Sequence, residues 1–199
     1  SAGNPATWTS WLKERGITVV HVVANTRFAQ KAAAAGVDAL VAEGFEAGGH
    51  NGREETTTLV LIPLIRKAVD IPLIAAGGIG NGAQMAACLA LGADAVQVGT
   101  RFVATFESSG HMAFKQRLIQ SSEGDTRLSL KQLTPVRLLD NPFARKVKEL
   151  EEQGADAETL RQWLGRGRAK LGMFEGDLEE GELEIGQVSC LVREIKPAR

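Results

Sequence analysis

Four short apolar segments, separated by stretches with helical patterning, constrain the fold of this chain more than any other feature. They are rich in β-branched residues, are apolar almost throughout, and comprise Ile17–Val23, Val37–Glu43, Ile71–Ala76 and Ala93–Gly99. Strands that are apolar on both faces are typical of a parallel sheet covered by helices. Alternating strands and helices build such a sheet through right-handed crossovers. The sequence therefore predicts an α/β fold with four parallel strands.

Helical patterns fill the intervals between these segments. We expect helices over Pro5–Arg15, Arg27–Ala35, Thr58–Val69 and Gly82–Leu91. Gly36 and Gly92 stand where two of them should end, whereas Pro63 argues against an unbroken third helix. The phrases Ala35–Leu40 and Leu91–Val96 echo one another, each a helix end followed by a strand start, which suits a barrel made of repeated units.

The pattern of apolar and polar residues changes after about residue 105. Amphipathic helices and no strands are expected in this part, over Phe114–Glu123, Ser129–Leu139, Pro142–Gln153, Ala157–Arg168 and Leu183–Val192. The stretch 175–184 holds six acidic residues and is expected to be a solvated surface without the ligand spacing of a calcium loop. We therefore expect two regions, an α/β region over 1–105 and a helical region over 106–199.

Composition excludes several classes of protein. The formal net charge of −1 gives no overall attraction to nucleic acid or to an anionic membrane. No apolar run is long enough to span a bilayer, and the opening residues have neither a basic nor an apolar signal region. Cys88 and Cys190 form no metal-binding pattern, so we expect free buried thiols, no metal site and a reducing, cytoplasmic location.

A glycine-rich stretch that follows the second strand contains the first candidate for chemistry. Residues 43–52 hold four glycines around His50, including Gly48 and Gly49, so the backbone there can approach a ligand closely. Histidine readily exchanges a proton near neutral pH, and catalytic groups of α/β folds gather where strands end. We favour a functional His50 over a loop histidine without a role. His21 is expected to be packed within a strand, and His111 is assigned no role.

Two further glycine loops follow the third and fourth strands. Gly77 and Gly78 lie in the first loop, Gly99 and Thr100 lie in the second, and Gly78 and Gly99 are 21 positions apart across one helix. In (β/α)8 barrels, loops after consecutive strands commonly bind a phosphate through backbone N–H groups. The pair of loops therefore predicts a phosphate site, without identifying the phosphate compound.

These motifs resemble those of a known family. The motifs are Glu46–His50 with Gly52, Ile74–Ile79 and Leu91–Phe102, together with the opening Ser1–Pro5 and the later Glu175–Asp177 and Gly186–Gln187. They are similar to those of the flavin-dependent nitronate monooxygenases, once called 2-nitropropane dioxygenases, a pattern shared by flavin-type enoyl-ACP reductases. The resemblance implies an FMN-binding (β/α)8 TIM-barrel fold with a helical substrate region.

The resemblance also implies roles for individual residues. His50 would act near the flavin, as a base for a neutral nitroalkane or as a contact for the nitronate. Gly77, Gly78, Gly99 and Thr100 would hold the FMN phosphate, Glu43 would touch the ribityl chain, and the glycines Gly48 and Gly49 would line the cofactor site. The flavin would carry the redox chemistry.

Three functions remain open on these grounds. The leading one is FMN-dependent oxidation of alkyl nitronates with O2. The second is reduction of an enoyl thioester by NADPH, in which the basic segment Arg166–Lys170 could face an NADPH phosphate or an acidic carrier protein instead of being a solvated helix end. The third is an inactive phosphate-binding or assembly fragment.

The third reading stays open because the first four strands of such a barrel have no counterpart here. We expect the chain to be the second half of a barrel, from a longer enzyme, with open strand edges. A small-molecule substrate and a homo-oligomer are the expected partners.

Overall fold

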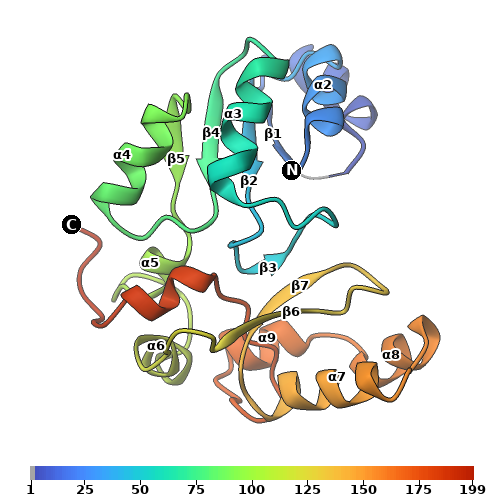
Figure 1. Ribbon diagram of the computed structural model, residues 1–199, viewed down its shortest axis with the longest axis vertical. Helices are drawn as coiled ribbons and strands as arrows, with labels where there is room; N and C mark the ends of the chain where they lie inside the picture. The colour runs from blue at the N-terminus through green and yellow to red at the C-terminus, as the bar shows by residue number, and fades with distance from the viewer. Residues whose placement is uncertain (1–2) are drawn as a thin grey trace. The chain divides into compact units, whose positions relative to one another are not determined.

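The computed structural model describes residues 3–199, and the chain in it divides into two compact units (Figure 1). One unit comprises the chain up to Glu46 together with Glu54–Val98, and the other comprises Ala47–Arg53 together with Gly99–Arg199. Ser1 and Ala2, which begin the N-terminal motif, lie outside the described residues.

A four-stranded parallel sheet forms the centre of the first unit. Its strands pair in the order β1-β2-β4-β5 and are β1 (Val20–Val23), β2 (Ala39–Glu43), β4 (Leu73–Ala76) and β5 (Ala95–Gln97). The α/β class and the parallel sheet predicted from the sequence are confirmed. Each strand is shorter than its apolar segment because some flanking residues, such as Val37, are buried in the core outside the ladder.

The two similar sequence phrases, Ala35–Leu40 and Leu91–Val96, have the same structural role, because the aspartate of each one binds a neighbouring strand. Asp38 accepts a hydrogen bond from the backbone N–H of Val19 at 2.7 Å, and Asp94 accepts one from the N–H of Leu73 at 2.8 Å. Each carboxylate thereby holds the chain just before or at the start of a neighbouring strand. Lys13 also bonds to Asp38, and this bond holds the pKa of that carboxyl below its usual range. The repeated aspartates thus help to set the strand register.

Helices cover the sheet, and asparagine side chains cap some of them. The helices are η1 (Pro5–Thr7), α1 (Thr9–Lys13), α2 (Thr26–Ala34), α3 (Thr58–Ala68) and α4 (Gly82–Ala90). The side chains of Asn25 and Asn81 accept from backbone N–H groups in the first turns of α2 and α4. The helix expected over Thr58–Val69 is confirmed as α3, which continues through Pro63. Its fully buried Ile62 and Ile65 pack into the same core as Leu40, which offsets the missing hydrogen bond.

The second unit combines helices with a small antiparallel sheet. The helices are α5 (Thr100–Val103), α6 (Met112–Ile119), α7 (Pro142–Glu152), α8 (Ala157–Leu164), α9 (Arg168–Met173) and η2 (Gln187–Leu191). The strands pair in the order β3-β7-β6 and are β3 (Gly49–His50), β6 (Thr126–Ser129) and β7 (Val136–Leu139).

The expected absence of strands after residue 105 is wrong. The segment Ser129–Leu139, for which we expected a helix, turns at Leu130–Leu133 and returns as β7. All four residues of β7 are buried, so the strand lacks the alternation that distinguishes strands from buried helices in a sequence.

The expected helix over Leu183–Val192 is also wrong as a whole. Only Gln187–Leu191 is helical, in a 3-10 conformation, and Glu184 forms a bridge to Leu138 instead. Within residues 3–199, no helix has the length and apolar character needed to cross a membrane.

The edges of the parallel sheet generate a prediction. β1 and β5 lie at its two ends, as expected, and within the described residues neither pairs with a further strand. Strands at open edges accept pairing from another chain. We therefore expect the purified chain to be a dimer or a larger assembly, which light scattering at micromolar concentration measures. A stable monomer would contradict this expectation.

Candidate functional site

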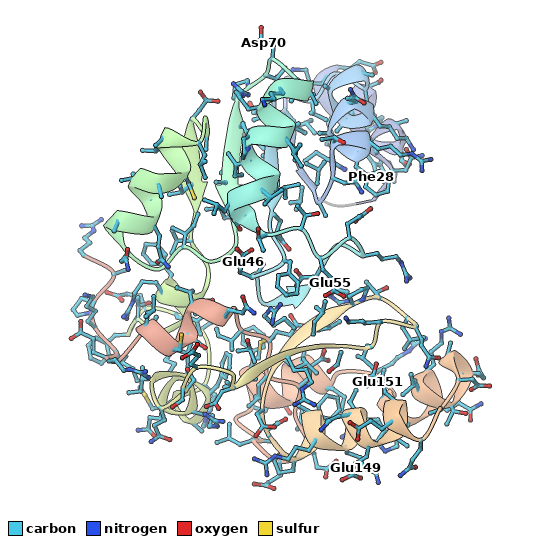
Figure 2. All side chains as sticks on the ribbon, in the orientation of Figure 1. Phe28, Glu46, Glu55, Asp70, Glu149 and Glu151 are labelled. Carbon is cyan, nitrogen blue, oxygen red and sulfur yellow. The ribbon has the colours of Figure 1, made fainter. Side chains whose placement is uncertain are left out.

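The carboxyl end of β2 carries two acidic side chains with different environments. Glu43 ends the strand half-buried, and removal from water raises the pKa of its carboxyl group. Glu46 follows in the next turn, beside the first turn of α3 (Figure 2). Its carboxylate accepts from the Thr58 backbone N–H at 2.9 and 3.1 Å.

The Thr58 hydroxyl extends this contact to the neighbouring strand. It lies 2.9 Å from Glu46 Oε2 and 3.0 Å from the carbonyl oxygen of Gly77, which follows β4. At Gly44 an added Cβ would stand 2.0 Å from this hydroxyl, so a larger residue has no room there. Glu46 and Thr58 therefore tie together the ends of β2 and β4 and the start of α3. In the sequence Glu46 stands out only as part of a motif, because carboxylates that bind a helix start in this way have no recognisable spacing.

The first glycine loop presents its backbone in a conformation that favours glycine. Gly77 and Gly78 have φ angles of 94° and 67°. The N–H of Gly78 donates to no atom of the residues that the structure describes. The loop by itself thus offers a free donor of the kind that binds an anion.

The second glycine loop, in the other unit, begins α5. An added Cβ at Gly99 would meet nothing within 4 Å, so the glycine opens onto free space. Among residues 3–199 the N–H groups of Gly99 and Thr100 have no acceptor, while the Thr100 hydroxyl accepts from Gly186 N at 3.1 Å. The second loop therefore offers further free donors, and the Thr100 side chain is held in place.

His50 lies in the short strand β3, where it is paired with Val136 of β7 and exposed. The two glycines before it are needed for packing. A Cβ added at Gly48 would come within 2.4 Å of the Ile185 carbonyl carbon. Gly49 has a φ of 74°, and a Cβ added there would come within 2.7 Å of Glu184 Oε2. Contact between flavin and Gly48 or Gly49 stays a prediction.

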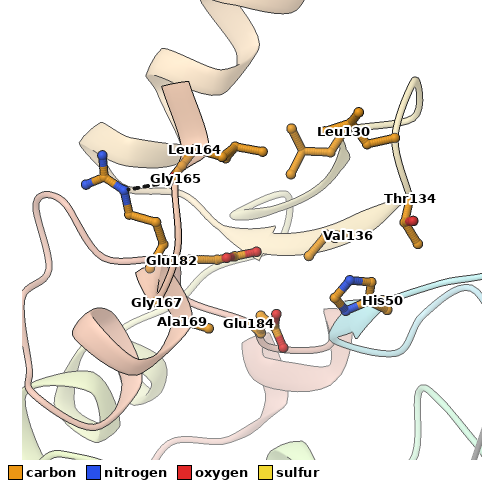
Figure 3. Close-up of a pocket in the computed structure, with 12 residues that line it drawn as sticks. His50, Leu130, Thr134, Val136, Leu164, Gly165, Gly167, Ala169, Glu182 and Glu184 are labelled. Atoms are coloured by element: carbon orange, nitrogen blue, oxygen red, sulfur yellow. Dashed lines mark hydrogen bonds between the residues drawn. The ribbon is translucent and has the colours of Figure 1, made fainter. Parts of the chain in front are cut away.

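A pocket of about 320 Å³ lies beside His50 in the second unit (Figure 3). Its apolar wall includes Leu130, Val136 and Leu164, and the carboxylates of Glu182 and Glu184 point into it. Burial and the neighbouring Glu184 raise the pKa of Glu182 to about 7. Burial also raises the pKa of Glu184, while His50 opposes this rise.

The expectation that the whole stretch 175–184 is a solvated surface is therefore wrong for its last two acids. The other histidines need no catalytic role. His21 is buried, as expected, which lowers its pKa, and His111 accepts from Ala113 N at the start of α6.

The basic segment Arg166–Lys170 is largely engaged. Arg168 donates to Leu164 and Glu180, and Lys170 pairs with Glu175 at 2.9 Å. These two cations are thus committed within the unit.

Comparison with known proteins identifies the family of this chain. The family model for nitronate monooxygenase matches residues 2–199. A probable nitronate monooxygenase from Staphylococcus saprophyticus is 33% identical over 193 residues, which are 92% of this chain and 54% of that protein.

Two solved structures agree with this result. FabK from Thermotoga maritima matches with a TM-score of 0.91 and 44% identity, over 98% of this chain and 61% of that one. A nitroalkane oxidase from Streptomyces ansochromogenes matches with a TM-score of 0.78 and 33% identity, over 100% of this chain and 58% of that chain. The chain belongs to the nitronate monooxygenase family, whose members are FMN-dependent oxidoreductases. It spans little more than half the length of these relatives.

The two glycine loops fit a flavin phosphate, each by itself. They supply free backbone donors at Gly78, Gly99 and Thr100, and the space at Gly99 is one that a Cβ would fill. The residues present are therefore compatible with the cofactor of the family.

Gly99 provides a direct test of this fit. Gly99→Val should lower FMN affinity at least about tenfold, because the side chain would occupy space next to the free donors. Gly82→Ala is a suitable control, since an added Cβ at that exposed helix position also meets nothing within 4 Å. Fluorescence titration of FMN measures both variants. Unchanged affinity in Gly99→Val would reject the assignment.

The raised pKa of Glu182 predicts a pH-dependent stability. A carboxyl with a folded pKa of about 7 and an ordinary value of 4.5 binds more protons in the folded state between these values. The free energy of unfolding should thus fall by about 1–2 kcal/mol as the pH rises through this window, since residual solvent reduces the full effect.

Urea denaturation of Glu182→Gln measures this effect. The variant should be more stable than the parent at about pH 8 and no more stable at about pH 4.5. Glu179→Gln, from the same acidic stretch but outside the pocket, should show no such difference. Parallel pH profiles for parent and Glu182→Gln would contradict the account.

Proposed function

We propose that the chain is part of an FMN-dependent oxidoreductase that oxidises alkyl nitronates with O2. The observation that carries this proposal is membership of the nitronate monooxygenase family along residues 2–199, together with a histidine beside an apolar pocket. The two free thiols and the composition support the further proposal of a cytoplasmic location.

Individual residues of the chain would have separate roles in binding the cofactor. Gly77, Gly78, Gly99 and Thr100 would hold the phosphate, and Glu43 would accept from a ribityl hydroxyl. Bound FMN would supply the redox chemistry.

His50 would act on the substrate. Its imidazole can accept a proton from a neutral nitroalkane or donate a hydrogen bond to a nitronate oxygen. The apolar wall of the pocket would receive the alkyl chain and exclude water from it.

Replacement of His50 distinguishes chemistry from cofactor binding. In FMN-loaded protein, His50→Ala should keep the flavin spectrum and lose about 10²–10⁴ in turnover. If the histidine only binds an anionic nitronate, the loss should appear mainly in KM. His111→Asn is the control, because asparagine can keep the helix cap that His111 provides. Full turnover in His50→Ala would reject the role.

A second candidate is flavin-dependent reduction of an enoyl thioester. The 44% identity to FabK, an enoyl-ACP reductase, favours it. It ranks second because it needs a nicotinamide reductant, and the basic residues considered for an NADPH phosphate are partly engaged in internal pairs. Anaerobic reduction of the flavin by NADPH would support the reductase, whereas turnover of a nitronate in air without NADPH would support the monooxygenase.

A further inference from the structure

Helix α3 is apolar both on the side that faces the sheet and on the side that faces away from it. Ile62 and Ile65 are fully buried in the core of the first unit. Leu59, Val60 and Leu64 lie on the outer side and keep 66%, 49% and 47% exposure. A helix that is apolar all round is normally covered on all its sides. The outer side of α3 therefore has the composition of a contact surface.

The two helices that α3 contacts, α2 and α4, differ in charge (Figure 1). The exposed positions of α2 include Arg27, Gln30 and Lys31, as expected for a helix that faces water. In contrast, α4 carries no charged residue over Gly82–Ala90, and four of its alanines are exposed. An uncharged surface thus extends over two neighbouring helices. We call it the α3–α4 face, and it comprises Leu59, Val60 and Leu64 of α3 with the exposed alanines of α4.

Charged side chains of opposite sign lie near the two ends of α3. Lys67, in the last turn, follows Val60 and Leu64 at helical spacing and so lies on the same side of the helix. Its ammonium group is exposed and has no hydrogen-bond or ion-pair partner among residues 3–199. Glu54 and Glu55, both exposed, precede the first turn. The α3–α4 face therefore has an acidic border at one end and a basic border at the other.

The other charged groups near these ends are engaged or lie beyond the helix. Arg66 donates to the Ile71 carbonyl and lies 3.6 Å from Asp94. Arg53 donates to backbone carbonyls of the second unit, at Lys131 and Leu133. Asp70 comes after the helix has ended (Figure 2). Lys67 is thus the cation that borders the α3–α4 face.

We propose that the α3–α4 face is the interface through which this chain forms a twofold-symmetric dimer with a second copy of itself, with the two α3 helices antiparallel. In a twofold dimer the same patch contacts itself. Antiparallel packing brings Leu59 opposite the partner's Leu64, and it brings Lys67 near the partner's Glu54. The apolar contact supplies the affinity, and the charged borders select this orientation over the parallel one.

The area of the face fits a dimer contact. Three side chains exposed by about half to two-thirds make an apolar patch on the order of 300 Å², a size that on a soluble chain often marks an interaction site. A stable dimer buries about 800 Å² on each partner. The α3 side chains would form the apolar centre of this area. The α4 alanines and the charged ends of α3 would form the remainder, and alanine side chains let helices approach closely.

The α3–α4 face lies on helices and is separate from the open strand edges of β1 and β5, so variants distinguish the two modes of association. Sedimentation velocity over a dilution series in the micromolar range measures the dimer dissociation constant. The variant Leu59→Lys/Leu64→Lys should raise this constant at least about a hundredfold, because each lost apolar contact occurs twice. Leu191→Lys is the matched control, since Leu191 is 58% exposed in the second unit, and it should leave the constant unchanged.

A charge exchange tests the antiparallel arrangement. Lys67→Glu alone should raise the dissociation constant about threefold to tenfold, because it places like charges together. Adding Glu54→Lys should recover this loss, since the opposite signs then meet again. Glu54→Lys also removes the bond to Asn25, so urea denaturation of each variant serves to confirm that it remains folded.

Three results would overturn the proposal. The first is a parent chain that stays monomeric over the whole series. The second is a dimer that persists in folded Leu59→Lys/Leu64→Lys, which would assign association to the strand edges. The third is a charge exchange that recovers nothing. The proposal goes beyond the proposed function and does not rest on it, because none of these measurements uses flavin or turnover.

Discussion

The hydrogen bonds between the Glu46 carboxylate and Thr58, in the first turn of α3, hold together the edge of the first unit where the candidate site lies. The carboxylate accepts from both the backbone N–H and the hydroxyl of Thr58, and that hydroxyl also lies 3.0 Å from the carbonyl oxygen of Gly77. One residue pair therefore fixes the ends of two parallel strands and one helix. The same closeness explains why Gly44 and Gly77 have no room for a side chain. Loops held in this way can present backbone donors without rearranging.

The glycines of the motifs turn out to serve different purposes. Gly99 opens onto space, which suits a ligand, whereas Gly48 permits two backbone segments of the second unit to touch. A glycine motif in a sequence gives no means of separating these cases, because both require the absence of a Cβ. The added-Cβ distances in the structure make the distinction.

Much of the first unit was predictable from the sequence because each local signal agreed with the next. Apolar strands, Asn25 and Asn81 as helix caps, and glycine helix ends all favour one parallel sheet.

The elements of the second unit are harder to predict from the sequence. β7 is buried on both faces, and its four residues carry no period that excludes a helix. The sequence therefore predicts a helix over Ser129–Leu139, where the structure has a turn followed by β7.

The candidate site was predictable in part. His50 was identified from its glycine setting, and the structure places it beside a pocket. The sequence predicts Glu182 and Glu184 to be surface acids, because nothing in an acid-rich stretch distinguishes the two that alternate with buried Leu183 and Ile185. Only the extended conformation of the segment separates them from the other acids. Their raised pKa values are a consequence of that placement.

We propose that the FMN site of this nitronate monooxygenase family member lies on the chain itself. The visible absorption spectrum of the purified chain, recorded during titration with FMN, tests it most directly. We expect saturable uptake approaching one flavin per chain, with a perturbed flavin spectrum. A chain that stays colourless after removal of free FMN, and whose titration shows no saturation, would contradict it.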